Sequence, residues 1–172
     1  MYYGNIKEND IANGLGIRVT LFVSGCRHHC KGCFNPETWN FKYGKEFTLE
    51  TENHIQSLLA NDFIDGLTLL GGEPFEPENQ QVLVNFIQKV KEKYPNKNIW
   101  CYSGYTFEQL TSNSFPHCEH TDKMLSLIDV LVDGEFEEDK KNLRLKFRGS
   151  SNQRLIDLNK TRSQRKIVLL EL

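Results

Sequence analysis

The chain has 172 residues, 38% of them hydrophobic and 26% charged, a balance that excludes a largely disordered polypeptide and predicts a single domain over residues 1–172. Its 21 lysines and arginines against 23 aspartates and glutamates give a formal charge of −2, so electrostatics gives no reason to expect nucleic acid or a membrane as a partner. No apolar run reaches the roughly 18–20 residues of a membrane span, and no secretion signal follows Met1, so the sequence predicts a cytoplasmic protein.

Strand and helix patterns alternate along the chain. The predicted strands are short apolar runs rich in β-branched or aromatic residues, at residues 17–24, 66–70, 98–102 and 130–132, with weaker extended candidates at 154–158 and 167–170. The predicted helices show apolar residues at helical spacing or a capping box, at residues 48–60, 83–94, 106–109 and 122–128. Such alternation indicates βαβ units around a parallel sheet, and therefore an α/β fold.

Each of the four stronger predicted strands is followed by a segment of unusual residues. These segments are residues 26–33, which contain three cysteines, and residues 71–74, 103–105 and 133–135. In parallel sheets, ligands bind beyond the carboxyl ends of the strands, which all lie at one edge. Because the four segments fall on that edge, the sequence predicts that they share one site.

Three of the five cysteines, Cys26, Cys30 and Cys33, follow the first predicted strand with C-x3-C-x2-C spacing. A short irregular loop with this spacing can bring three sulfurs to three corners of an iron–sulfur cube. A fourth cysteine would saturate the cluster, whereas three leave one iron open, and an open metal position allows chemistry. The spacing therefore favours a catalytic cluster.

The cysteine pattern also leaves alternatives open. A zinc site is the competing interpretation, with His28 or His29 as a fourth ligand, although no second pair of cysteines follows at a distance. Incidental thiols are a further one. Cys101 and Cys118 stand apart and are interpreted as ordinary thiols, but Cys101 could in principle supply a fourth cluster ligand.

The cysteine motif after a first strand, together with Gly71-Gly72-Glu73-Pro74, resembles the radical S-adenosylmethionine superfamily. The resemblance implies an abbreviated, partly open (β/α) barrel and a [4Fe-4S] cluster on the three cysteines with one open iron. It further implies that S-adenosylmethionine chelates this iron and is cleaved to methionine and a 5′-deoxyadenosyl radical, so that no catalytic side chain is expected. The residues expected to bind the cosubstrate are Gly32, Cys33, Phe34, Gly71, Gly72, Glu73, Ser103 and Asp133.

Physical reasons accompany these assignments. The two adjacent glycines lack a Cβ and allow a ligand close to the backbone, while Pro74 biases Glu73 toward an extended shape. Carbonyls held open in this way can accept from the ligand's ammonium group. Ser103 is placed to bind the ribose or carboxylate of the cosubstrate, and Asp133 to meet either the ligand or a partner chain. In each case an ordinary turn is the alternative.

A closer resemblance covers most of the chain and is to the family of proteins that activate anaerobic ribonucleoside-triphosphate reductase. It is carried by residues 10–33, 35–39, 71–74, 103–105, 132–136 and 148–154. The resemblance implies that an external one-electron donor reduces the cluster and that the radical removes a hydrogen atom from a glycine of the reductase large subunit. Arg148, Asn152 and Arg154 in the last segment are expected to bind this partner, with a capped turn as the alternative.

Three other functions are weighed against this one. An activase of another glycyl-radical enzyme, of the pyruvate formate-lyase type, would share the chemistry, but residues 148–154 and the short chain argue against it. A small-molecule radical S-adenosylmethionine enzyme, such as a deazapurine synthase, would need no protein partner. A noncatalytic zinc-binding module would contain no iron and would be colourless.

Overall fold

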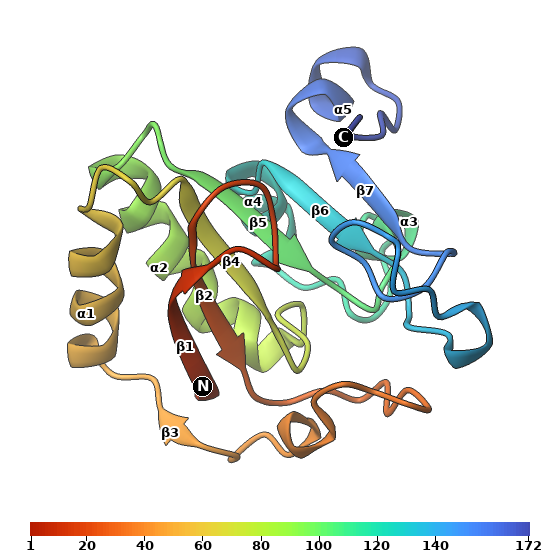
Figure 1. Ribbon diagram of the computed structural model, residues 1–172, viewed down its shortest axis with the longest axis horizontal. Helices are drawn as coiled ribbons and strands as arrows, with labels where there is room; N and C mark the ends of the chain where they lie inside the picture. The colour runs from red at the N-terminus through yellow and green to blue at the C-terminus, as the bar shows by residue number, and fades with distance from the viewer.

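Four apolar runs of the sequence form the parallel centre of a sheet in the computed structural model, which describes residues 1–172. These strands are β2 (Arg18–Val23), β4 (Gly66–Gly71), β5 (Asn98–Tyr102) and β6 (Val130–Asp133), and they lie side by side in that order (Figure 1). Each corresponds to a predicted strand, with ends that differ by at most one residue. The parallel arrangement predicted from the alternation of strands and helices is confirmed.

Antiparallel strands extend the sheet at both edges. On one side β1 (Tyr2–Asp10) pairs with β2, and the two-residue β3 (Lys45–Glu46) pairs with β1; neither was predicted. On the other side β7 (Arg154–Asp157) pairs with β6, as the candidate at residues 154–158 indicated. The candidate at residues 167–170 was wrong as a strand, because it contributes only an isolated bridge between Ile156 and Leu169.

The sheet does not close on itself. Its order is β3-β1-β2-β4-β5-β6-β7, so β3 and β7 form opposite edges, and Figure 1 shows them at opposite ends of the molecule. The predicted α/β class is confirmed, and within it the structure is an open, seven-stranded mixed sheet.

The helices bury a large apolar core against the sheet. They are α1 (Leu49–Leu59), α2 (Pro77–Lys93), α3 (Phe107–Leu110), α4 (Thr121–Leu127) and α5 (Leu158–Gln164), with short 3₁₀ turns η1 (Pro36–Trp39) and η2 (Glu138–Lys140). Thr48 and Thr106 cap α1 and α3 by accepting from backbone amides, and α2 begins earlier than predicted, at Pro77. No helix has both the length and the apolar character needed to cross a membrane.

Beyond this core, the sheet carries a smaller apolar cluster and a buried polar network. Trp100, Val130, Val132 and Leu155 form the second cluster, against which Phe147 packs.

Arg18 is fully buried and donates to the side chains of Thr68 and Asn98 and to three backbone carbonyls. Since such a guanidinium is satisfied only by acceptors from several strands, it fixes the packing at the end of the sheet remote from the cysteine loop.

Candidate functional site

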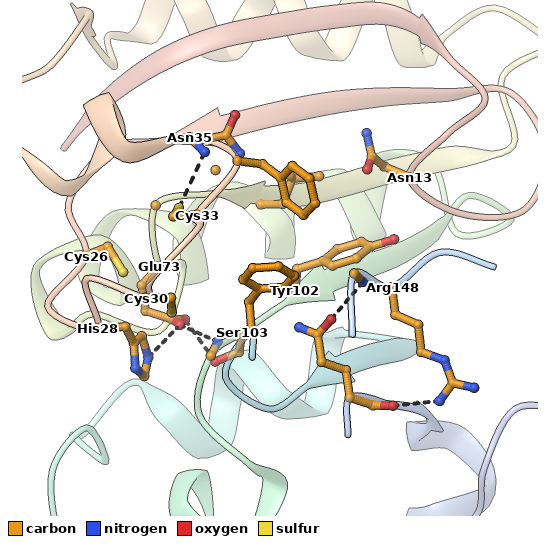
Figure 2. Close-up of a pocket in the computed structure, with 18 of the residues that line it drawn as sticks. Asn13, Cys26, His28, Cys30, Cys33, Asn35, Glu73, Tyr102, Ser103 and Arg148 are labelled. Carbon is orange, nitrogen blue, oxygen red and sulfur yellow. Dashed lines mark hydrogen bonds and ion pairs between the residues drawn. The ribbon is translucent and has the colours of Figure 1, made fainter. Parts of the chain in front are cut away.

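A cavity of about 580 Å³ lies where the carboxyl ends of the parallel strands meet. Its floor includes Phe22, Leu70 and Tyr102 from β2, β4 and β5, and its lining includes residues from each of the four segments that follow the parallel strands. Figure 2 shows the three motif cysteines at one end of the cavity, Asn13 at the other, and Tyr102 between them. The structure thus brings the four segments together, as their positions after the strands predict.

The thiols of Cys26, Cys30 and Cys33 are all unbridged and all line this cavity. Burial raises the pKa of Cys26 to about 12, with the nearby carboxylate of Glu73 acting in the same direction, and burial raises the pKa of Cys30 to about 11. Both shifts favour the neutral thiol over the thiolate. A cationic iron centre supplies the positive charge that would make them thiolates.

The donor set fits an iron–sulfur cluster. The backbone amide of Asn35 donates to Cys33 Sγ at 3.4 Å, a contact typical of cluster-bound sulfur, which accepts hydrogen bonds from the surrounding backbone. No group of three or more histidine, cysteine, aspartate or glutamate side chains is arranged to hold a single metal ion. Thiols that bind separate corners of a four-iron cube need to line one cavity rather than meet at a point, and these three do so.

The remaining two cysteines lie away from this cavity. Cys101 is fully buried in the core cluster that the helices cover, and it does not line the cavity. Cys118 lies beside Gln80, with its sulfur 3.5 Å from Gln80 Oε1. The structure therefore gives Cys101 no position as a fourth ligand, and both residues match their interpretation as ordinary thiols.

An ion pair between the exposed Arg27 and the buried Glu76 anchors the cysteine loop to the start of α2. The carboxylate of Glu76 is fully buried and accepts from the backbone amide of Arg27 at 2.8 Å and from the Arg27 guanidinium. The same guanidinium binds Glu78 and lies over the rings of Phe41 and Phe115. Sequence reasoning missed this anchor, because 49 residues separate Arg27 from Glu76 and no motif joins them.

The side chain of Glu73 connects several loops of the site. Its carboxylate is buried and accepts from the Ser103 hydroxyl at 2.9 Å, the Gly104 amide at 2.7 Å and the Phe75 amide at 2.8 Å, and it lies 3.3 Å from His28 Nε2 (Figure 2). Glu73 thereby joins the loops after β2, β4 and β5. Both Glu73 and Ser103 line the cavity, but their side chains bind each other, so contact with a ligand falls mainly to the backbone around them.

Gly71 and Gly72 are required by the packing of the chain itself. A Cβ on Gly71, whose φ is 112°, would lie 2.7 Å from the carbonyl oxygen of Val23. A Cβ on Gly72 would lie 2.6 Å from the carbonyl oxygen of Gly25, just before the first motif cysteine. The absence of side chains thus lets the end of β4 press against the end of β2 and the cysteine loop, while both glycines still line the cavity.

The residues around the third cysteine lie at the mouth of the cavity. Cys33 and Phe34 line it, and the Phe34 ring packs against Phe136 with centroids 5.1 Å apart. Gly32 is exposed and lies outside the lining, where a Cβ would approach the carboxylate of Glu138 at 2.9 Å. Its position gives no support to direct contact with a ligand in this cavity.

Asp133 and Arg154 bind each other and join elements of the fold. The carboxylate of Asp133 is fully buried; it accepts from the Phe107 amide at the start of α3 and from the Arg154 guanidinium. Asp133 ties β6 to β7 and to α3 and is absent from the lining of this cavity, but it lines a smaller adjoining pocket with His28 and Gly104, so its expected role toward the cosubstrate stays a prediction. Arg154, expected to bind a partner, also pairs with Glu108, and these bonds raise its pKa. Asn152 donates to the carbonyl of Glu135.

This ion pair predicts a pH dependence of stability. Hydrogen bonds from Arg154 lower the pKa of Glu108 from 4.5 to about 2, so the folded state binds this proton less readily than the unfolded chain. The pair therefore stabilises the fold above pH 4.5 and loses its contribution as the pH falls toward 2. Between pH 4.5 and 2, the free energy of unfolding should fall less in Glu108→Gln than in wild type. The difference should be less than about 1 kcal/mol, because the pair is partly exposed. Denaturant unfolding across this pH range measures the free energy in both proteins. The same pH dependence in variant and wild type would show that the Glu108–Arg154 pair does not contribute as expected.

One wall of the cavity is held in shape by Gln153. Its Oε1 accepts from the amides of Gly149 and Ser150, at 2.8 and 3.1 Å, and its Nε2 donates to the Gly134 carbonyl at 2.9 Å. Arg148 lines this wall, and its guanidinium donates to the backbone carbonyl of Gln153 and turns away from the motif cysteines (Figure 2). Residues of the wall that line the cavity include Asn142, Leu143, Leu145 and Phe147.

Gln153→Leu should loosen this wall, because it leaves two backbone amides and a carbonyl without their partner. We expect a loss of about 1–2 kcal/mol and hydrogen exchange of the Gly149 and Ser150 amides on the order of tenfold faster. Gln153→Glu keeps the acceptor for both amides and is the matched control, with slower exchange expected than in the leucine variant. Equal exchange in wild type and Gln153→Leu would show that the bonds do not hold the wall.

Comparison with known proteins agrees with the chemistry of this cavity. A family model described as a 4Fe-4S single cluster domain matches residues 12–156, which places the chain in the class of iron–sulfur proteins. The chain is 41% identical over 155 residues to the anaerobic ribonucleoside-triphosphate reductase-activating protein of Enterobacteria phage T4, covering 90% of this chain and 93% of that protein. Proteins with the same name from Pasteurella multocida and Escherichia coli K12 are 43% and 39% identical, each over 89% of this chain and at least 95% of the relative. The chain belongs to the family of anaerobic ribonucleoside-triphosphate reductase-activating proteins.

Proposed function

We propose that this protein activates an anaerobic ribonucleoside-triphosphate reductase by generating a radical on a glycine of the reductase large subunit. The observation that carries the proposal is the convergence of Cys26, Cys30 and Cys33 with the Gly71–Gly72 backbone on one cavity. A cluster bound by three thiolates has an iron free to bind a cosubstrate, and the proposed cosubstrate is S-adenosylmethionine. The names of the curated relatives support the proposed partner.

The size and walls of the cavity suit these ligands. Its volume of about 580 Å³ lies within the usual range for small-molecule sites, and its lining combines apolar rings with backbone groups. The backbone of Gly71 and Gly72 is available to the amino group of the cosubstrate, and Phe34 with Phe136 offers aromatic surface beside the third cysteine. The open sheet, with its site at the carboxyl ends of four consecutive parallel strands, suits an abbreviated barrel of the radical S-adenosylmethionine type.

When both cofactors are bound, one electron from an external donor cleaves S-adenosylmethionine to methionine and a 5′-deoxyadenosyl radical, which takes a hydrogen atom from the glycine α-carbon and becomes 5′-deoxyadenosine. The protein's own contribution is to bind, orient and shield. The three thiols hold the cluster, and Glu73 fixes the loops around it. The wall held by Gln153 is part of the lining that would shield the radical from water.

The test uses protein purified and loaded with iron and sulfide without oxygen. With S-adenosylmethionine, a reductant and the reductase large subunit, we expect 5′-deoxyadenosine and a glycyl radical signal by electron spin resonance. Pyruvate formate-lyase in place of the reductase should give no such signal. Cosubstrate cleavage without a signal on the reductase would favour a small-molecule reaction, and a colourless protein containing zinc would overturn the proposal.

A further inference from the structure

A basic loop borders the mouth of the cavity. Residues 140–148 contain Lys140, Lys141, Arg144, Lys146 and Arg148, and no aspartate or glutamate occurs between residues 140 and 153. This concentration of positive charge runs against the chain as a whole, whose formal charge is −2. Such a local excess of one sign on a near-neutral protein indicates a surface for a partner of the opposite charge.

Most of these cations have no carboxylate partner. Lys140 pairs with Glu137, but Lys141, Arg144, Lys146 and Arg148 form no ion pair. Lys141 instead lies over the Phe34 ring at 5.0 Å, and Arg148 donates to a backbone carbonyl. Arg144 and Lys146 are exposed, and neither lines the cavity. The charges of the loop are therefore available to a molecule that approaches the cavity from outside.

The loop has a defined shape and an apolar centre. Its ends are joined by a bridge between Lys141 and Ser150 and by the Asn142 amide, which donates to the Gly149 carbonyl at 3.2 Å. Between the cations, Leu143 is 86% exposed at the cavity, and nearby Phe34 is 58% exposed. Exposed apolar side chains among unpaired cations suit a polypeptide better than a nucleic acid backbone, which offers phosphates but little apolar surface.

We propose that the basic loop, residues 140–148, is a docking surface for an acidic segment of the reductase. Carboxylates of that segment pair with Arg144 and Lys146, and one of its apolar residues packs against Leu143. The proposal rests on the proposed function for the identity of the partner. It replaces Arg154 as the expected docking residue, since that guanidinium is already bound by Asp133 and Glu108. Docking here places the partner directly over the cavity that contains the three cysteines.

The experiment compares two charge-reversal variants of the iron-loaded protein. R144E/K146E reverses the exposed cations of the loop, and K123E/K166E makes the same change in net charge at exposed lysines that form no ion pair and lie away from the cavity. Binding to the reductase large subunit is measured by calorimetry, without cosubstrate or reductant. We expect R144E/K146E to bind on the order of tenfold more weakly than wild type, and K123E/K166E to bind like wild type.

A second measurement keeps the proposal testable if a variant loads iron poorly. The affinity of the wild-type protein should fall as ionic strength rises, and K146Q alone should make that fall less steep. If R144E/K146E and K123E/K166E bind the reductase large subunit with equal affinity, the proposed docking surface is wrong. The proposal is also wrong if the protein binds DNA tightly through this loop but does not bind the reductase. If R144E/K146E binds the reductase more weakly but the wild-type protein forms no glycyl radical, the docking surface is supported and the proposed function is wrong.

Discussion

Replacement of Cys26, Cys30 or Cys33 by alanine is expected to abolish both iron loading and cleavage of S-adenosylmethionine. Each thiol lines the cavity, and the structure places no other cysteine there to replace it. A cluster with two thiolates loses a corner ligand, so the effect should be complete rather than graded. Iron content, the visible absorption of the anaerobic protein and the yield of 5′-deoxyadenosine measure the outcome.

Cys118→Ser and Cys101→Ala are the matched controls for this series. Cys118 lies beside Gln80, and Cys101 lies in the helix-covered core, so neither variant should lose iron. Cys101→Ala is expected to lower stability slightly while cleavage persists, because it removes only a buried sulfur. Full cleavage in any of the three motif variants would contradict the ligand assignment, and loss of iron in Cys101→Ala would show that it is a fourth ligand.

Glu73→Gln is expected to destabilise the fold and to disorder the site. The buried carboxylate accepts from the amides of Phe75 and Gly104 and from the Ser103 hydroxyl, and both of its oxygens are used. A glutamine must turn its NH₂ group toward one of these donors, which leaves a buried amide unpaired. We expect a loss of about 2–4 kcal/mol, equivalent to a fall in melting temperature of about 5–15 °C for a chain of this size.

Thermal unfolding under anaerobic conditions measures this loss of stability. The yield of 5′-deoxyadenosine measures whether the site still supports cleavage of the cosubstrate. The control is Glu171→Gln, which makes the same chemical change at an exposed residue near the end of the chain and should leave both quantities unchanged. A Glu73→Gln protein with wild-type melting temperature would show that the three hydrogen bonds do not carry the stability attributed to them.

The strands predicted from the sequence are those with a strong local pattern. β2, β4, β5 and β6 are short apolar runs in which β-branched and aromatic residues recur, because they lie in the middle of the sheet and bury both faces. β1, with the sequence YYGNIKEND, was not predicted. Its side chains are mostly exposed or half-buried, and its strand form depends on the hydrogen bonds of β2 rather than on apolar alternation.

The site shows the same division between local and long-range information. The cysteine and Gly-Gly-Glu-Pro motifs could be found from the sequence because each is contiguous and follows a predicted strand. The ion pair of Arg27 with Glu76 joins residues 49 positions apart, and that of Asp133 with Arg154 joins residues 21 positions apart. Residue types alone do not reveal such partners, so the sequence did not predict that Asp133 and Arg154 bind each other.

The anchor of Arg27 on Glu76 has a consequence for an enzyme that meets air. Because the side chain and the backbone amide of Arg27 hold the start of the cysteine loop on Glu76, we expect this part of the loop to keep its position when no cluster is bound. Oxygen that strips the cluster would thus leave an intact, folded scaffold rather than a collapsed one. We expect that fresh iron and sulfide would restore such a molecule in place, without synthesis of a new chain.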